Sequence, residues 1–249
     1  MDTNTDLDLK PIQQWYKAQQ STGQPLPELR LRLATPAHKG HGAELRQQAL
    51  NLGENPFVFF QLPDDPLPDY PETLLRTLAE HPTATAIYGQ TETRLLDGTR
   101  LETFPPTKPD GTFVYDPLRA SRLFPTYLNP HSALFRRQLF ASLPYTDGQP
   151  WQRYHSCAFF TRLLNSTETL LTFPQVVKHT LRPKDNNGQL TPALASALIT
   201  DARAWAQYIK DPAEAQFQHQ LLGRLEAQEI NSFQEIQGQI EEFLDDLKV

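Results

Sequence analysis

The sequence predicts an α/β fold: a mixed, mostly parallel sheet flanked by helices, followed by a helical C-terminal extension. Up to about residue 190, apolar runs of strand length alternate with segments of helical periodicity. From Thr191 onwards, nearly every segment repeats its apolar residues every three or four positions. With 249 residues, the chain has the length of one large domain or two small ones. We therefore assign residues 1–190 to an α/β domain and residues 191–249 to a helical extension.

The composition argues against several classes of protein. The formal net charge is −6 at pH 7, which argues against a nucleic-acid partner. The single cysteine, Cys157, excludes an intrachain disulfide framework and a cysteine-based zinc cluster. No apolar run approaches the ~18 residues of a membrane span, and the acidic N-terminus lacks the pattern of a signal peptide. We expect a soluble, cytoplasmic protein without a transmembrane segment.

The first elements follow from hydrophobic periodicity. Alternation of leucine and arginine predicts a strand at 29–34, and helical spacing predicts a helix at 41–54. The continuous apolar run at 57–62, with proline on both sides, predicts a buried, parallel strand. A helix at 72–80 and a strand at 84–88 complete a strand-helix-strand unit.

The middle of the chain predicts a hairpin, two helices and a strand. Asp97-Gly98 favours a tight turn between strands at 91–96 and 99–104. The same periodicities predict further elements: helices at 132–142 and 151–165, and a strand at 169–178.

The last predicted helix has an apolar stripe that something must cover. The stripe consists of Phe233, Ile236, Ile240, Phe243, Leu244 and Leu247. Packing within the chain is one alternative. A homodimer through this C-terminal helix is the other, since symmetric dimers are the commonest oligomers.

Two adjacent carboxylates follow the predicted buried strand. Asp64 and Asp65 come at its C-terminal end, where ligands of open α/β sheets bind. Carboxylate oxygens suit Mg²⁺ or Mn²⁺, ions that often bridge to diphosphates. The alternative is a solvated Asp-Pro turn that caps the next helix.

The stretch Phe57–Pro82 resembles the acidic-motif region of inverting family-2 glycosyltransferases with the GT-A fold. It contains an apolar strand, Leu-Pro-Asp-Asp, Pro-Leu-Pro-Asp-Tyr, a helix and His-Pro. The segment Ile87-Tyr88-Gly89 is similar to the family's next strand, which ends in small polar residues. Further upstream, His38–Leu50 resembles the family's Asn-x-Gly segment and the helix after it. The residues Asp2–Asp6 resemble the Asp-Gly-Ser-Thr-Asp loop that touches the nucleotide.

Two later segments extend the resemblance over roughly residues 1–185. The segment Arg136–Phe140 resembles the Arg-Arg segment before the acceptor helix. The segment Trp151–Leu164 resembles that helix, with the family's Arg-Leu at Arg162-Leu163. Residues 1–190 would then be a GT-A-like glycosyltransferase domain.

The resemblance implies sugar transfer from a nucleoside diphosphate sugar, with UDP as the expected nucleotide, to a glycan or glycolipid acceptor with inversion. It implies Mn²⁺ or Mg²⁺ on Asp65, with Asp64 on the metal or the ribose and Asp2 beside the base or ribose. Arg136 and Arg137 are candidates to hold the diphosphate bidentately; their alternative is a solvated helix face. The pathway implied is assembly of a surface polysaccharide or glycolipid.

Three departures from the family pattern affect the expected activity. The chain starts at the Asp-Gly-Ser-Thr-Asp-like loop, so the expected domain is N-terminally incomplete and lacks the family's first strand-helix-strand. The first aspartate of the acidic motif is Leu62 here, and the catalytic Glu-Asp pair is replaced by His155-Ser156.

The acceptor hydroxyl needs a general base. His155 is the first candidate, because imidazole titrates near neutrality, and Asp147 in the preceding turn is the second. Their alternatives are a histidine bonded to a backbone carbonyl and an ordinary turn aspartate. The competing function is a catalytically degenerate GT-A-like domain that acts as a binding or interaction module.

Overall fold

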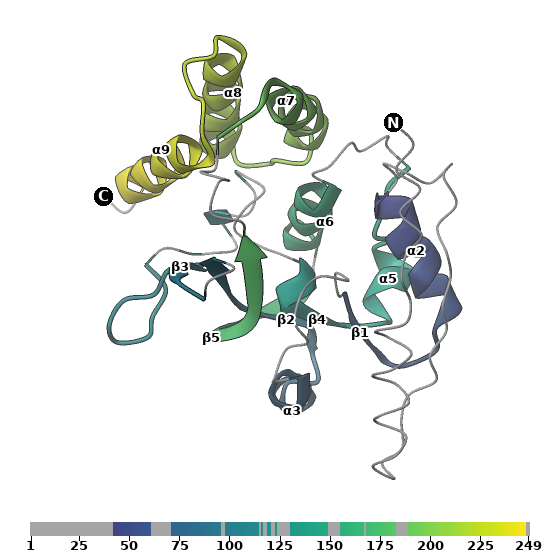
Figure 1. Cartoon of the computed structure of the whole chain (residues 1–249). Helices are drawn as coiled ribbons and strands as arrows, with labels where there is room; N and C mark the ends of the chain where they lie inside the picture. Colours follow the sequence, from purple (N-terminus) through teal and green to yellow (C-terminus); the bar gives the residue numbers. More distant parts are fainter. Residues whose placement is uncertain are drawn as a thin grey trace, which may run out of the picture. The chain divides into compact units, whose positions relative to one another are not determined.

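The computed structural model describes one compact unit, Ala34–Val249, of the two into which the chain divides. The described residues are 42–60, 71–95, 98–114, 116, 119–120, 123, 130–148, 155–166, 168–182 and 189–247. Helices pack on a five-stranded mixed sheet in these residues, which confirms the predicted α/β class (Figure 1). The helical C-terminal region is confirmed as well.

The elements agree with most of the predicted positions. The strands are β1 (Phe57–Phe59), β2 (Ala84–Leu95), β3 (Arg100–Phe104), β4 (Ala133–Arg136) and β5 (Thr169–Arg182). The helices are α2 (Gly42–Leu52), α3 (Pro71–Glu80), α5 (Leu139–Ser142), α6 (His155–Leu164), α7 (Pro192–Ala206), α8 (Pro212–Glu226) and α9 (Phe233–Asp246), with the 3-10 turn η2 (Pro130–Ser132).

The sheet has the order β1-β4-β2-β3, and β5 pairs with the other edge of β2. The strand β4 is antiparallel to both β1 and β2, and β3 is antiparallel to β2; only the β2–β5 ladder is parallel among the described strands. The prediction of a mostly parallel sheet is therefore wrong for these strands. The strands β1 and β2 do point in the same direction, as a strand-helix-strand crossover requires. They are not paired with each other, because β4 lies between them.

The segment 132–142 differs most from its prediction. The sequence predicts a helix throughout, but Ala133–Arg136 forms β4 and only Leu139–Ser142 is α-helical. The strand residues Ala133, Leu134 and Phe135 are buried on alternating faces of the sheet. An apolar run of this length fits either a strand or a helix, and packing on both faces favours the strand.

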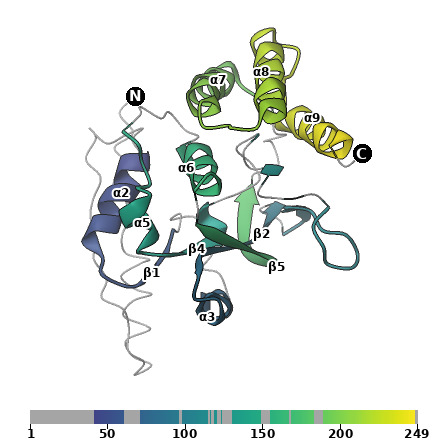
Figure 2. The ribbon, with the colours of Figure 1, turned by 180° about the vertical axis from the view of Figure 1, so that it is seen from behind.

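The two faces of the sheet are covered by different helices, as Figures 1 and 2 show. On one face, Leu74 and Leu78 of α3 pack with Ile87, Leu134 and Val177. On the other face, Ala86 and Phe135 pack with Phe159 of α6 and with residues of α7, α8 and α9. The helical extension thus shares one continuous core with this face of the sheet.

The three C-terminal helices begin at well-formed caps. The side chains of Thr191 and Asp211 accept backbone hydrogen bonds at the starts of α7 and α8, each followed by proline. A capping box of Ser232 and Glu235 begins α9.

The apolar stripe of α9 is covered within the chain. Ile236, Ile240 and Leu244 are buried in the main core, and Phe243 stacks on Phe217 of α8 with ring centroids 4.4 Å apart. Only Leu247 at its end is exposed among the described large apolar residues. The intramolecular alternative is confirmed, so the stripe needs no second copy of the chain to cover it. No described helix has the length and apolar character that crossing a bilayer requires.

Candidate functional site

The candidate site lies at the carboxyl end of β1. The acidic turn with Asp64 and Asp65 follows Phe60 in the sequence; both aspartates lie outside the described residues, as does Asp2. The strand register places Phe59 opposite Leu134 near the start of β4, so η2, which precedes β4, lies at this end of the sheet. Carboxyl ends of strands are where ligands bind in open α/β sheets.

Four polar side chains converge here, and we name them the Arg46 cluster: Arg46 of α2, His131 of η2, Tyr145 between α5 and α6, and His155 of α6. Arg46 Nη1 donates to His155 Nε2 at 2.9 Å and to Tyr145 Oη at 3.2 Å. Arg46 Nη2 donates to His131 Nε2 at 2.9 Å. Since a guanidinium only donates, each imidazole accepts from it through Nε2 in this arrangement.

Aromatic rings hold the cluster in place. The Arg46 guanidinium lies 5.6 Å from the ring centroid of Phe60 and 5.4 Å from that of Tyr145. Tyr145 in turn stacks on Phe159 of α6, with centroids 4.7 Å apart. The residue that leads into the acidic turn, Phe60, is therefore in direct contact with the cluster.

Burial and charge make His155 a weak base. Its pKa is lowered from 6.5 to about 3, first by burial and then by the charges of Arg46 and His131. Burial also raises the pKa of Tyr145 to about 12, so its phenol stays protonated. The nitrogens of His155 already bind Arg46 and Tyr145. A neutral imidazole with so low a pKa has little tendency to take a proton from an acceptor hydroxyl.

Asp147, the other candidate base, links the turn after α5 to the helical extension. Its carboxylate accepts a hydrogen bond from the hydroxyl of Tyr208, after α7. Burial and this bond raise the pKa of Tyr208 to about 12. Arg162 of α6 donates to the carbonyls of Pro144 and Tyr145 at 3.0 and 2.9 Å, which holds the same turn. The bond to Tyr208 thus gives Asp147 a structural contact.

Removal of the Tyr208 hydroxyl is expected to destabilise the protein without changing its chemistry. Tyr208→Phe should lower the free energy of unfolding by about 1 kcal/mol, because it removes one hydrogen bond to a charged group at a partly exposed position. Urea denaturation of Tyr208→Phe, Asp147→Asn and the double variant measures the effect. Additive losses would contradict the assigned contact, since partners in one bond are non-additive.

Arg136 and Arg137 point in different directions and bind backbone carbonyls. Arg136 Nε donates to Ala84 O at 2.8 Å and its Nη2 to Leu78 O at 2.7 Å, on the α3 side of the sheet. Arg137 Nε donates to Asn55 O at 2.5 Å, and its Nη1 donates to Leu50 O. Each arginine donates at least two hydrogen bonds to backbone carbonyls. That they bind a diphosphate stays a prediction.

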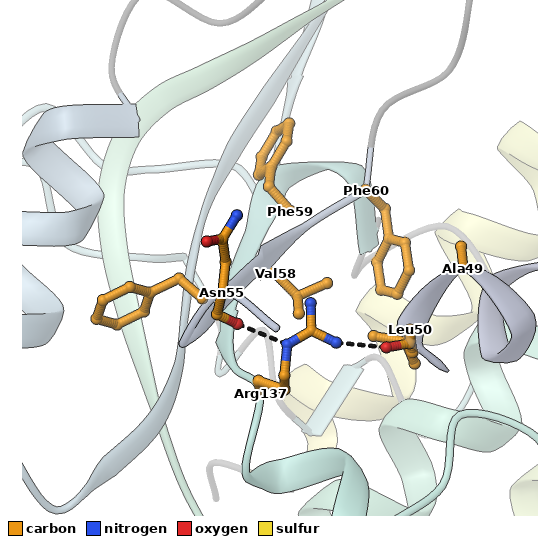
Figure 3. A pocket seen from close by; sticks show the side chains of 8 residues that line it. Ala49, Leu50, Asn55, Val58, Phe59, Phe60 and Arg137 are labelled. Carbon is orange, nitrogen blue, oxygen red and sulfur yellow. Dashed lines mark hydrogen bonds between the residues drawn. The ribbon is translucent and has the colours of Figure 1, made fainter. Parts of the chain in front are cut away.

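Figure 3 shows Arg137 between β1 and the end of α2, beside a cavity of about 210 Å³. The cavity is lined by Ala49, Leu50, Asn55, Phe57, Val58, Phe59, Phe60 and Arg137. Because the guanidinium holds the carbonyls at the end of α2 and in the following loop, it fixes how α2 enters β1. Arg137 therefore stabilises the backbone that leads from α2 into β1.

A metal site is not found within the described ranges, where no group of three or more His, Cys, Asp or Glu side chains is arranged to hold an ion. The predicted ligands Asp64 and Asp65 lie outside those ranges. Two adjacent carboxylates supply the hard oxygen donors that Mn²⁺ and Mg²⁺ prefer, so the donor chemistry fits the implied ion.

Sequence reasoning missed Arg46 and Tyr145 and gave His131 no role in the site. The bonded pairs Arg46–His131 and Arg46–His155 are 85 and 109 positions apart in the sequence. No local spacing links residues so far apart, so only the folded arrangement reveals the cluster.

Comparison with known proteins leaves the family open. No protein-family model matches the chain, and a search of curated proteins finds no significant match.

Proposed function

We propose that the chain is a glycosyltransferase-like protein that binds a nucleoside diphosphate sugar at the carboxyl end of β1. The observation that carries the proposal is the position of the Arg46 cluster. A buried polar cluster, costly to maintain in a protein core, contacts Phe60, the last described residue before the acidic turn. The order of acidic turn, α3 and β2 along the chain agrees with the resemblance to family-2 glycosyltransferases.

In this proposal Asp65 binds Mn²⁺ or Mg²⁺, Asp64 binds the ion or the ribose, and Asp2 lies beside the base or ribose. The ion supplies positive charge that stabilises the departing diphosphate. Arg136 and Arg137 hold α3, β2, α2 and the loop before β1 in position, since their donors bind carbonyls of these segments. UDP is the proposed nucleotide, and a glycan or glycolipid is the proposed acceptor.

A binding module without catalysis is the second candidate. The low pKa of His155 favours it, because this imidazole is not poised to accept a proton. Assays of UDP-sugar hydrolysis and transfer separate the two functions. Turnover by the wild type supports the transferase; UDP binding without turnover supports the module.

Asp65→Asn is expected to abolish the gain in UDP affinity that Mn²⁺ provides. Asparagine keeps the size of the side chain but removes the charge that holds the ion. Isothermal titration of UDP into wild type and variant, with and without Mn²⁺, measures the gain. Equal gains in the two proteins would remove Asp65 from the site.

Glu80→Gln is the matched control, since it removes one carboxylate from the exposed end of α3. It should leave the Mn²⁺-dependent gain unchanged. Thermal unfolding of both variants verifies that each is folded during the titration.

A further inference from the structure

Arg46 differs from every other arginine whose contacts the structure describes. Arg94, Arg100, Arg119, Arg203 and Arg224 pair with carboxylates. Arg136, Arg137 and Arg162 donate to backbone carbonyls. Among the described residues, the guanidinium of Arg46 contacts only imidazole, phenol and aromatic groups.

This arrangement leaves the charge of Arg46 without a described counter-charge. The side chain is half-buried, and its partners His131, Tyr145 and His155 are all buried. Hydrogen bonds and cation–π contacts offset part of the cost of removing a cation from water, but an anion would offset more. Arg46 itself is only half-buried, so part of the residue is accessible to solvent.

We infer that Arg46 binds a phosphate group of a ligand at the carboxyl end of β1. The planar guanidinium matches two phosphate oxygens at once. His131 and His155 lie beside it, within hydrogen-bond distance of the guanidinium. The inference deepens the proposed function and rests on it: the phosphate belongs either to the nucleoside diphosphate or to a phosphate-bearing acceptor.

Phosphate binding should also take up protons. The charged or titratable groups that face His155 in the described part of the chain are Arg46 from α2, His131 from η2 and Tyr145 from the preceding turn. An anion on Arg46 offsets the positive charge that helps to keep His155 neutral. Affinity for phosphate should therefore rise as the pH falls from 8 to 6.

The test is titration of inorganic pyrophosphate into the full chain in EDTA, without a divalent ion. We expect binding to the wild type and at least a tenfold loss of affinity in Arg46→Gln. Arg76→Gln, which removes one positive charge from the exposed face of α3, should bind as the wild type does. Equal affinity of folded Arg46→Gln and wild type, or no binding to the wild type, would overturn the inference.

Two further measurements keep the test decisive if Arg46→Gln fails to fold. Arg46→Lys keeps the positive charge but loses the paired donors of the planar guanidinium, so its affinity for pyrophosphate should fall. Unchanged affinity overturns the inference. In the wild type, titration in buffers of different ionisation enthalpy should show proton uptake on binding. Release of protons, or no change, contradicts a phosphate placed beside the imidazoles.

Competition distinguishes the two sources of phosphate. If UDP in EDTA displaces pyrophosphate, Arg46 binds the donor's diphosphate; if UDP–Mn²⁺ and pyrophosphate bind together, it binds a phosphate of the acceptor. The proposed function and this inference fail by different results. If the proposed function is wrong, Asp65→Asn keeps the gain in UDP affinity that Mn²⁺ provides. If this inference is wrong, Arg46→Gln keeps the pyrophosphate affinity of the wild type.

Discussion

At pH 4, His155 is expected to make the folded protein about 3 kcal/mol less stable than at pH 7, and His155→Gln should abolish that share of the loss. The pKa of His155 is about 3 in the folded chain and close to 6.5 in an unfolded one. Below pH 6.5 the unfolded chain binds a proton that the folded chain does not. Stability therefore falls by about 1.4 kcal/mol per pH unit as the pH drops from 6.5 towards 3.

Urea denaturation at pH 7, 6, 5 and 4 measures this effect as the difference between wild type and variant. Glutamine keeps an acceptor for Arg46 but does not titrate in this range. His219→Gln, at an exposed position of α8, is the control and should follow the wild-type curve. If the unfolding free energies of His155→Gln and wild type differ by the same amount at every pH, His155 binds its proton equally in the folded and unfolded chains. Its pKa would then not be lowered by folding.

The hydrogen bond between Arg46 and His155 also changes the expected pH dependence of catalysis. A general base with the ordinary imidazole pKa would lose activity below about pH 6.5. His155 is too weak a base to produce that profile while Arg46 binds it. If transfer is observed and falls near pH 6.5, the titrating group is another residue or the cluster rearranges on ligand binding.

Phe135→Ala is expected to lower the free energy of unfolding by about 3–5 kcal/mol. Phe135 is fully buried and lies on β4, the strand between β1 and β2, where it pairs with Val58 and Ala86. Its ring contacts those of Phe60, Phe140 and Phe159 with centroids 5.5–5.9 Å apart. Truncation leaves a cavity in the centre of the sheet that these rings are too constrained to fill.

Leu247→Ala is the control for this substitution. Leu247 is 38% exposed just after α9, so its truncation should cost less than about 0.5 kcal/mol. Denaturant midpoints and slopes of both variants separate a loss of stability from a change in cooperativity. A cost for Phe135→Ala near that of the control would mean that β4 is not central to the core.

Local periodicity predicted the elements well where each segment has one clear pattern. The helices α3 and α6 lie where the sequence placed them, and the predicted hairpin forms between β2 and β3. The strands expected at 84–88 and 91–96 are one continuous strand, β2. Gly98, with φ of +87°, occupies the expected turn and adopts a backbone conformation that favours glycine. These elements depend on neighbours within a few positions, so a single sequence contains the information for them.

Strand pairing was not predictable in the same way. Ala133–Arg136 has an apolar pattern that suits either a helix or a strand, and nothing in its sequence names a partner. Its insertion between β1 and β2 converted an expected parallel pair into two antiparallel ladders. Burial on both faces of the sheet decided the outcome, because it satisfies the backbone and covers the apolar side chains together.

The sequence by itself determined the α/β class, the helical C-terminal region and the pair Asp64-Asp65 after an apolar strand. Tertiary structure alone decided the Arg46 cluster, the cover of the α9 stripe and the contact of Asp147 with Tyr208. The reason is the range of the interactions. Adjacent residues and short periods are visible along the chain, whereas burial, charge compensation and a lowered pKa depend on groups that only folding brings together.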